Sequence, residues 1–170
     1  MALLEICKYP DPVLRQKASP IKLIDREVLR LVDDMAETMY DAPGVGLAAN
    51  QVGKPVRLIL VDPQREGCPK GLIVLINPEI VSASGEITWE EGCLSVPEYY
   101  AAVKRPGEIT VRGLDRDGRE IEITASGFLA VVLQHEMDHL EGKLFIDHLN
   151  PVARDIFKRR WKKTHKEGKS

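Results

Sequence analysis

The chain has 170 residues, of which 44% are hydrophobic and 29% charged, so one domain can bury a full core. This composition excludes intrinsically disordered, collagen-like and disulfide-scaffold proteins. The longest apolar runs, such as residues 72–76, are far shorter than the roughly 20 residues of a membrane-spanning helix. Charged residues interrupt the first twenty positions, so we expect a cytoplasmic protein without a secretory signal or a membrane partner.

The formal net charge of −2 conceals an uneven distribution. Residues 158–170 contain seven Lys or Arg and one acidic residue, whereas the preceding part contains 17 basic and 25 acidic residues. A short basic segment can bind a polyanion, and a merely solvated tail is the alternative. The three cysteines, at positions 7, 68 and 93, are too few and too scattered for a disulfide framework. In a reducing compartment their thiols are free for metal binding or catalysis.

The first predicted helix begins after Asp25, a good N-cap residue. Apolar residues then recur at helical spacing as far as Met39, before Pro43 and Gly44 end the pattern. Short runs typical of strands follow, and the Asp-Arg-Asp-Gly sequence at 115–118 is typical of a hairpin turn between the last two. These runs are 56–61, 72–76, 86–89, 99–103, 109–114 and 120–124.

A second helix is predicted from Ser126 to Gly142, and its unusually apolar centre indicates burial. Asn150 and Pro151 form the N-cap and first turn of a third helix that continues into the basic segment. Consecutive strands without intervening helices favour antiparallel pairing. We therefore predict an α+β fold, with antiparallel β-sheets around the central buried helix and one further helix towards each end of the chain.

The sequence His135-Glu136-Met137-Asp138-His139 lies within this central helix. Because residues four apart share one face of a helix, both imidazoles can reach one metal ion. Glu136 lies in the same turn and can take a proton from a water on that metal without being a ligand. The structural alternative is a pair of core histidines hydrogen-bonded to the backbone.

A catalytic metal site needs a third protein ligand and an open position for water. The metzincin pattern fails because Phe145 stands where its last histidine belongs, and the region where a thermolysin-like glutamate would lie holds only Lys and Arg. Cys93 is the best candidate, since it follows Gly92 in a turn where a backbone can approach a metal closely. A buried structural thiol at Cys93, with His148 or Asp147 as the ligand, remains the alternative.

The segment GVGLAANQVG at 44–53 has too many small residues to be ordinary core. It lacks the Gly-Lys-Ser/Thr ending of a phosphate-binding loop. A glycine-bounded extended stretch can offer free backbone groups to a peptide, and Gln51 can donate a hydrogen bond to a developing oxyanion. A tight turn with a buried, satisfied glutamine is the alternative.

Three motifs, GVGLAANQVG, EGCLS at 91–95 and QHEMDHLEG at 134–142, stand in the order and at the separations typical of the peptide deformylases. The opening YPDPVLRQKA is similar to the same family, so the resemblance covers essentially the whole chain. It resembles in particular the bacterial form with a C-terminal helix. The resemblance implies hydrolysis of the N-formyl group from N-formylmethionyl nascent polypeptides, with release of formate. We expect a catalytic metallohydrolase domain at 1–150, followed by a C-terminal helix and basic tail at 151–170.

The resemblance also implies roles for individual residues. Cys93, His135 and His139 become the metal ligands, and Glu136 becomes the general base and acid. Gln51 and the backbone N–H of Leu94 would stabilise the tetrahedral oxyanion. The remaining residues would bind the substrate backbone or line the methionine pocket and its rim: Gly44, Val45, Gly46, Trp89, Phe128, Val131 and Val132.

The helix motif alone favours Zn²⁺, whereas the resemblance implies Fe²⁺, with Zn²⁺, Ni²⁺ or Co²⁺ able to replace it. Imidazole and thiolate ligands suit several of these ions. Two positions depart from the family pattern: Tyr100 stands where many bacterial relatives have an arginine, and Trp89 where an aliphatic residue is more usual. Both departures concern the preference for substrate side chains.

The basic C-terminal helix resembles the segment by which related enzymes dock on the large ribosomal subunit. The resemblance implies binding to ribosomal RNA, with the strong salt dependence of phosphate contacts, through Lys158, Arg159, Arg160, Lys162 and Lys163. We expect the protein to be a monomer. Two rival functions are a general metallopeptidase and a non-catalytic ribosome-binding module with a structural metal. The second is disfavoured because a closed metal site needs a fourth protein ligand.

Overall fold

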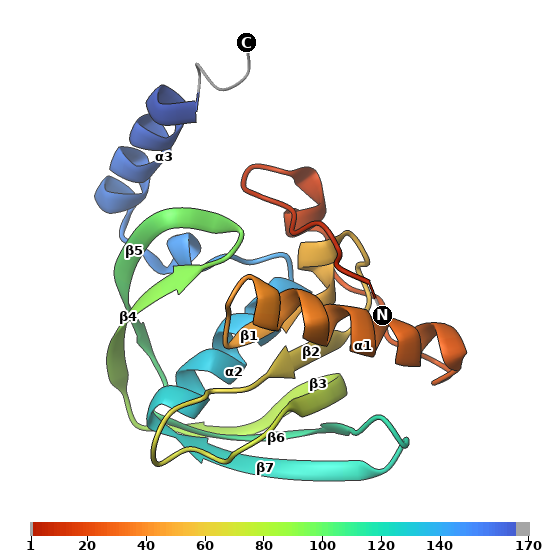
Figure 1. Cartoon of the computed structure of the whole chain (residues 1–170). Helices are drawn as coiled ribbons and strands as arrows, with labels where there is room; N and C mark the ends of the chain where they lie inside the picture. Colours follow the sequence, from red (N-terminus) through yellow and green to blue (C-terminus); the bar gives the residue numbers. More distant parts are fainter. Residues whose placement is uncertain (1, 166–170) are drawn as a thin grey trace.

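The computed structural model describes residues 2–165, which form an α+β fold (Figure 1). The helices are α1 (Arg26–Asp41), α2 (Gly127–Leu140) and α3 (Pro151–His165), and the short 3-10 helices are η1 (Pro12–Arg15), η2 (Ala49–Val52) and η3 (Phe145–His148). The strands are β1 (Gly46–Ala48), β2 (Leu58–Val61), β3 (Ile73–Ser84), β4 (Ile87–Cys93), β5 (Val96–Arg105), β6 (Glu108–Leu114) and β7 (Glu120–Ser126).

Five strands form one antiparallel sheet in the order β1-β2-β3-β6-β7, and β4 pairs with β5 in a separate hairpin. Side chains of β2 alternate between the two faces of the larger sheet, as the two-residue period of a strand requires. Ile59 and Val61 belong to the core that contains α2, whereas Leu58 and Leu60 belong to the core that contains α1. The sheet therefore separates the two helices, and β1 lies at its edge.

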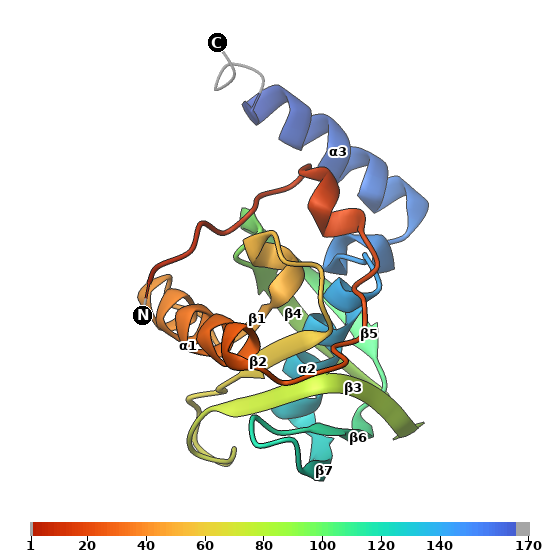
Figure 2. The ribbon, with the colours of Figure 1, turned by 90° about the vertical axis from the view of Figure 1, so that its right-hand side faces the viewer.

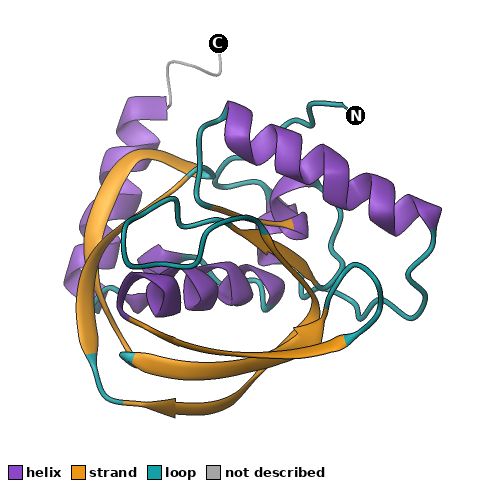
Figure 3. Ribbon diagram, turned by 60° about the horizontal axis from the view of Figure 1, so that its bottom comes forward, coloured by secondary structure: helices purple, strands orange, loops and turns teal. Residues whose placement is uncertain are grey.

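Helix α2 lies along the inner side of the curved strands (Figure 3). Eleven of its 14 residues are buried, which explains why its apolar residues are not confined to one face. Ser126 occupies the predicted N-cap position, although its side chain makes no capping hydrogen bond. Gly142 follows the helix with a φ of +74°, and a Cβ there would lie 2.5 Å from the backbone oxygen of Arg15. Only glycine fits this close approach without a shift of the backbone.

Helix α3 packs its apolar side on a third core that includes β5 and η3. Phe157 and Trp161 are buried there, and the ring of Tyr9 makes edge contacts with both. Figure 2 shows α3 beside the N-terminal segment that carries η1. Asn150 Oδ1 accepts a hydrogen bond from the Ala153 backbone N–H at 2.8 Å, as predicted for an N-cap.

The predicted fold class is confirmed, including the three helices and the antiparallel pairing of the strands. The predicted run 72–76 is too short, because β3 continues through exposed residues to Ser84. Strand β1 and the 3-10 helices were not predicted. None of the helices within residues 2–165 is both long enough and apolar enough to cross a membrane. The last five residues of the predicted basic tail, 166–170, lie outside the described residues.

Candidate active site

Cys93, His135 and His139 come together in the structure from two elements. Cys93 ends β4, and the two histidines lie one turn apart on α2. One donor atom of each residue lies within 4.8 Å of those of the other two, and Cys93 Sγ is 3.5 Å from His139 Nε2. The competing candidates lie elsewhere: Asp147 pairs with Arg15, and His148 Nε2 lies 2.8 Å from Asp138 Oδ2.

The backbone around Cys93 directs polar hydrogens at its sulfur. The register of β4 and β5 shifts between Gly92 and Cys93, so the chain turns tightly towards β5. The Ser95 backbone N–H donates to Cys93 Sγ at 3.4 Å, and Gln51 Nε2 donates at 3.6 Å. Two hydrogen-bond donors therefore face the sulfur of the candidate ligand.

A buried ion pair orients His135. Arg105 Nε and Nη2 donate to the two carboxylate oxygens of Glu91 at 2.6 and 2.8 Å, and both side chains are 3% exposed. Burial alone would raise the pKa of Glu91, but Arg105 and His135 lower it. Glu91 is therefore an ionised acceptor for the Nδ1–H of His135 at 3.0 Å. This hydrogen bond orients the ring so that Nε2 is the nitrogen available to a metal.

The charges around the three residues suit a cation. Burial alone would lower the pKa of His135, yet Cys93 and Glu91 raise it well above its ordinary value. These neighbours thus favour a positive charge where His135 meets Cys93. Burial and His135 lower the pKa of His139 well below its ordinary value, which keeps this imidazole neutral. Ligands to a divalent metal must be deprotonated, and a neutral imidazole beside a negative environment fits that requirement.

Glu136 lies beside this group without joining it. Its side chain is buried, and its Oε1 has no hydrogen-bond partner within residues 2–165. Burial raises the pKa of Glu136 to about 7. A Cβ at position 46 would lie 2.5 Å from Glu136 Oε2, so Gly46 makes room for the carboxylate. A carboxyl group with this pKa can both take up and release a proton near neutral pH.

Gln51 lies on η2, next to Cys93. Its Oε1 accepts from the Ala48 backbone N–H at 2.9 Å, so its Nε2 faces Ser95 Oγ at 3.0 Å and Cys93 Sγ. Leu94 follows Cys93, and a Cβ at Gly44 would lie 2.8 Å from Leu94 Cδ1. The predicted segment 44–46 therefore borders the turn that carries the candidate ligand Cys93.

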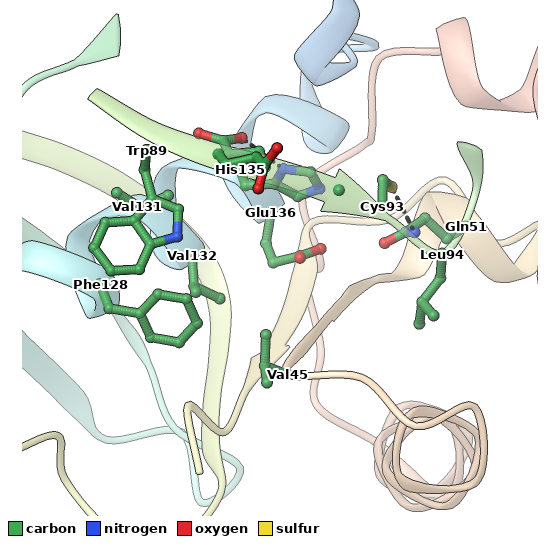
Figure 4. Close-up of a pocket in the computed structure, with 13 residues that line it drawn as sticks. Val45, Gln51, Trp89, Cys93, Leu94, Phe128, Val131, Val132, His135 and Glu136 are labelled. Carbon is green, nitrogen blue, oxygen red and sulfur yellow. Dashed lines mark hydrogen bonds and ion pairs between the residues drawn. The ribbon is translucent and has the colours of Figure 1, made fainter. Parts of the chain in front are cut away.

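A cavity of about 160 Å³ opens beside Glu136 and His135. Figure 4 shows Trp89 and Phe128 on one side of this cavity and Gln51, Cys93 and Leu94 on the other. Val45 also borders it, and Val131 and Val132 line it from α2. Trp89, one of the two residues that differ from the family pattern, therefore lines the cavity. Tyr100 is 65% exposed and lies against Gly92, where a Cβ would be 2.6 Å from its Cε1.

Comparison with known proteins identifies the family. A family model described as polypeptide deformylase matches residues 3–155. The chain belongs to the polypeptide deformylase family. It is 67% identical over 167 residues to a peptide deformylase of Syntrophobacter fumaroxidans, with 98% of each chain covered. It is 54% identical to a peptide deformylase of Agrobacterium fabrum, with 92% of each chain covered.

Solved structures of polypeptide deformylases have the same fold. The crystal structure of a peptide deformylase from Legionella pneumophila matches with a TM-score of 0.90 and 47% identity over 98% of each chain. A peptide deformylase from Ehrlichia chaffeensis in complex with actinonin matches with a TM-score of 0.89 and 40% identity, over 96% of this chain and 98% of that chain. The resemblance found in the sequence is therefore confirmed. Polypeptide deformylases are metal-dependent, and Cys93, His135 and His139 form a group that could bind the metal.

Sequence reasoning assigned no role to Glu91, Arg105, Asp138 or Ser95 in this deformylase site. Asp138 Oδ2 accepts from Arg105 Nη1 at 2.8 Å and so holds the far side of the guanidinium. Glu91 lies in the motif EGCLS and Asp138 in QHEMDHLEG. A carboxylate so near a predicted metal ligand could have indicated a role for both residues. No pattern in the sequence pointed to Arg105, since it lies 14 residues from Glu91 and pairs with it only through the β4–β5 hairpin.

Proposed function

We propose that this protein is a peptide deformylase that hydrolyses the N-formyl group of N-formylmethionyl nascent polypeptides and releases formate. The observation that carries the proposal is the convergence of three features at one cavity. These features are a three-residue metal-binding group, a buried carboxyl group with a pKa of about 7, and an apolar pocket. Membership of the deformylase family supports the same reaction. A general metallopeptidase and a non-catalytic ribosome-binding module have no such support.

We assign the metal to Cys93, His135 and His139, with Fe²⁺ as the physiological ion and Zn²⁺, Ni²⁺ or Co²⁺ as substitutes. A divalent ion held there would supply Lewis-acid activation of water and of the formyl carbonyl. The chain contributes the geometry of its ligands: Glu91 fixes the ring of His135, and the Ser95 N–H donates a hydrogen bond to Cys93 Sγ. Metal analysis of protein purified without oxygen checks the identity of the ion.

Glu136 is the proposed general base and acid. It takes the proton from the attacking water and returns it to the leaving amine, so one carboxyl group serves both halves of the reaction. Its raised pKa supports this double role. Its free Oε1 supports it as well, because a buried carboxylate oxygen needs a partner that substrate or water can provide.

Gln51 and Leu94 are the proposed oxyanion donors. The Gln51 amide is held by its acceptor contact with Ala48, so the orientation of Nε2 is fixed before substrate arrives. Such preorganised donors stabilise charge that develops during the reaction. The backbone N–H of Leu94 is the second donor that we assign, on the turn between β4 and β5.

The substrate backbone is proposed to pair with residues 44–46. Strand β1 is the edge of its sheet and pairs only with β2 among the described strands. An extended peptide can therefore add to its open edge, as in other proteins that recognise peptides by strand addition. The methionine side chain would then occupy the cavity, with Trp89 and Phe128 as its aromatic wall and Val131 and Val132 along α2.

Formate release tests the proposal directly. The metal-loaded protein is incubated with formyl-Met-Ala-Ser, beside Glu136→Ala and Glu136→Gln loaded with the same metal. We expect the wild type to release formate and both variants to lose about 10²- to 10⁴-fold in kcat, because each lacks the proton acceptor. Equal metal content in all three proteins excludes loss of the ion as the cause. No formate from metallated wild type would contradict the function.

We further propose a catalytic domain at 1–150 with the helix and tail at 151–170 as an appendage, in a cytoplasmic monomer. Helix α3 supports a role in ribosome binding, because its two faces differ. Its buried face carries Phe157 and Trp161. The basic residues predicted to bind ribosomal RNA are all exposed, namely Lys158, Arg159, Arg160, Lys162 and Lys163.

A further inference from the structure

The loop at 62–72, between β2 and β3, places Arg65 against the aromatic wall of the cavity. Arg65 Cζ lies 4.1 Å from the centroid of the Phe128 ring and 5.2 Å from that of the Trp89 ring. The two ring centroids are 5.3 Å apart. Both distances from the guanidinium are within the range of cation–π attraction. Trp89 and Phe128 line the cavity and Arg65 does not, so any effect of Arg65 on substrate acts through these rings.

The same loop is fixed at the other side of the cavity. Gln64 Nε2 donates to the Gly44 carbonyl oxygen at 3.3 Å, and the Asp62 backbone N–H donates to the Val45 carbonyl at 2.8 Å. Cys68 is partly buried against the core cluster that also contacts Phe128. The Cys68 N–H donates to the Arg65 carbonyl at 3.1 Å, which closes a turn between them. The loop therefore joins the peptide-binding segment 44–46 to the aromatic wall.

The Arg65 guanidinium contacts the rings of Trp89 and Phe128. Arg65 forms no ion pair within residues 2–165. Trp89 and Phe128 are each only partly buried, so contacts from outside the core can help to hold their rings. A planar cation across both rings restricts them, and Arg stacks on aromatic faces in a way that Lys does not.

We propose that Arg65 is a positioning residue that holds Trp89 and Phe128 in place and thereby sets the preference for a methionine-sized side chain. This inference rests on the proposed function, in which the first side chain of the substrate enters the cavity. Without Arg65 the rings move towards solvent, and a side chain that fills the cavity loses contact with its wall. A substrate without a side chain makes no such contact and does not respond.

The test compares two substrates across three variants. Formyl-Met-Ala-Ser fills the cavity, whereas formyl-Gly-Ala-Ser does not. For Arg65→Ala we expect the KM for formyl-Met-Ala-Ser to rise about three- to fivefold with little change in kcat, as the loss of one exposed cation–π contact predicts. Kinetics with formyl-Gly-Ala-Ser should be unchanged. Arg65→Lys should recover only part of the loss, and Lys70→Ala, which removes an exposed charge from the same loop, should behave as wild type.

The inference is overturned if Arg65→Ala impairs the hydrolysis of both substrates equally or changes neither. It is also overturned if Lys70→Ala has the same effect as Arg65→Ala. If the wild type releases formate but does not prefer formyl-Met-Ala-Ser, the proposed pocket is wrong and Arg65 has no such role. If the wild type releases no formate at all, the proposed function itself fails. A second readout is the fluorescence of Trp89 in a Trp161→Phe background, which should shift when Arg65 is replaced by Ala; an unchanged spectrum contradicts the proposal.

Discussion

Glu91 connects the candidate metal site to a buried ion pair with Arg105. Among residues 2–165, this is the only ion pair in which both side chains are 3% exposed. Its Oε1 accepts from both Arg105 Nη2 and His135 Nδ1, and its Oε2 accepts from Arg105 Nε. Hydrogen bonds of this kind orient a ligand imidazole and raise its basicity. Two buried charges therefore hold the imidazole ring of His135 in place. Replacing Arg105 should mainly lower stability, whereas replacing Glu91 should mainly weaken metal binding.

Replacing Arg105 with Met should destabilise the fold by about 3–5 kcal/mol, because it leaves the buried Glu91 carboxylate without its compensating charge. Urea denaturation of the metal-free protein measures this loss. The double variant Arg105→Met with Glu91→Gln should recover part of it. Arg112→Met removes an arginine that is 44% exposed and should change stability by no more than about 0.5 kcal/mol. An equal effect of the two single arginine variants would count against the buried pair.

Replacing Glu91 alone with Gln should instead weaken metal binding by about 10- to 100-fold, because the amide is a poorer acceptor for His135 Nδ1–H. Competition with a chelator of known affinity measures the change. Glu90→Gln is the matched control, since Glu90 is the exposed neighbour on the same strand. Metal affinity equal to that of wild type in Glu91→Gln would show that His135 does not depend on this hydrogen bond.

At the scale of elements, predictability followed the strength of the local pattern. Helices α1 and α2 were predicted because each combines a cap residue or glycine stop with many apolar positions, and the hairpin β6–β7 because its turn is distinctive. The end of β3 was missed because residues 79–84 are exposed and carry no alternation. Strand β1 was missed because its three residues, Gly46–Ala48, are too few to show the alternation of a strand. Its pairing with β2 is a tertiary contact.

In the candidate site, too, residues in a local pattern were predicted, whereas residues joined only by tertiary contacts were not. The two histidines were predicted as a pair because four residues on one helix determine their separation. Cys93 lies more than forty residues away, and periodicity could not choose between it and His148 or Asp147. The turn after Gly92 favoured Cys93 and the family resemblance agreed, and the structure then places Cys93 beside the histidines. Arg65 and Arg105 act through contacts that only the assembled sheets create.

The two short helices η1 and η3 are joined by an ion pair with a predictable pH dependence. Arg15 Nη1 and Nη2 donate to Asp147 at 2.6 and 3.2 Å. Burial alone would raise the pKa of Asp147, but Arg15 and the Leu144 N–H lower it. A carboxyl group with a lowered pKa in the folded state stabilises the protein above its unfolded pKa of about 3.9, and this contribution is lost as the pH falls through the folded value.

Arg15→Met should therefore lower the free energy of unfolding by about 1 kcal/mol or less at pH 7. The difference from wild type should stay constant between pH 7 and 5 and begin to shrink only below about pH 4, where Asp147 starts to be protonated and no longer attracts the guanidinium. Urea denaturation at pH 7, 5 and 3.5 follows the trend, with Arg119→Met, which removes an exposed arginine, as the control for loss of a surface charge. A difference that stays constant down to pH 3.5, or grows, would contradict this assignment.

At the scale of the whole molecule, the core around η3 connects the candidate metal site to the C-terminal helix. Cys93 packs against this core, and Phe157 and Trp161 of α3 are buried in it. The C-terminal helix is thus anchored through its apolar face while its basic face remains exposed. Removing the chain beyond Phe157 would also remove Trp161 and its contact with Tyr9, so truncation would confuse loss of a partner with loss of stability.

Charge substitution separates the two effects. Lys158, Arg159 and Lys162 are exposed and can be changed together to Glu without touching the buried face of α3. If the basic face binds ribosomal RNA, co-sedimentation with ribosomes at low salt should be lost in this variant, while turnover of formyl-Met-Ala-Ser is retained because the cavity is lined by other elements. The wild type should also dissociate steeply as salt increases. Co-sedimentation that survives both treatments would place ribosome binding, if it occurs, on another surface, and would leave α3 as a structural support for β5 and η3.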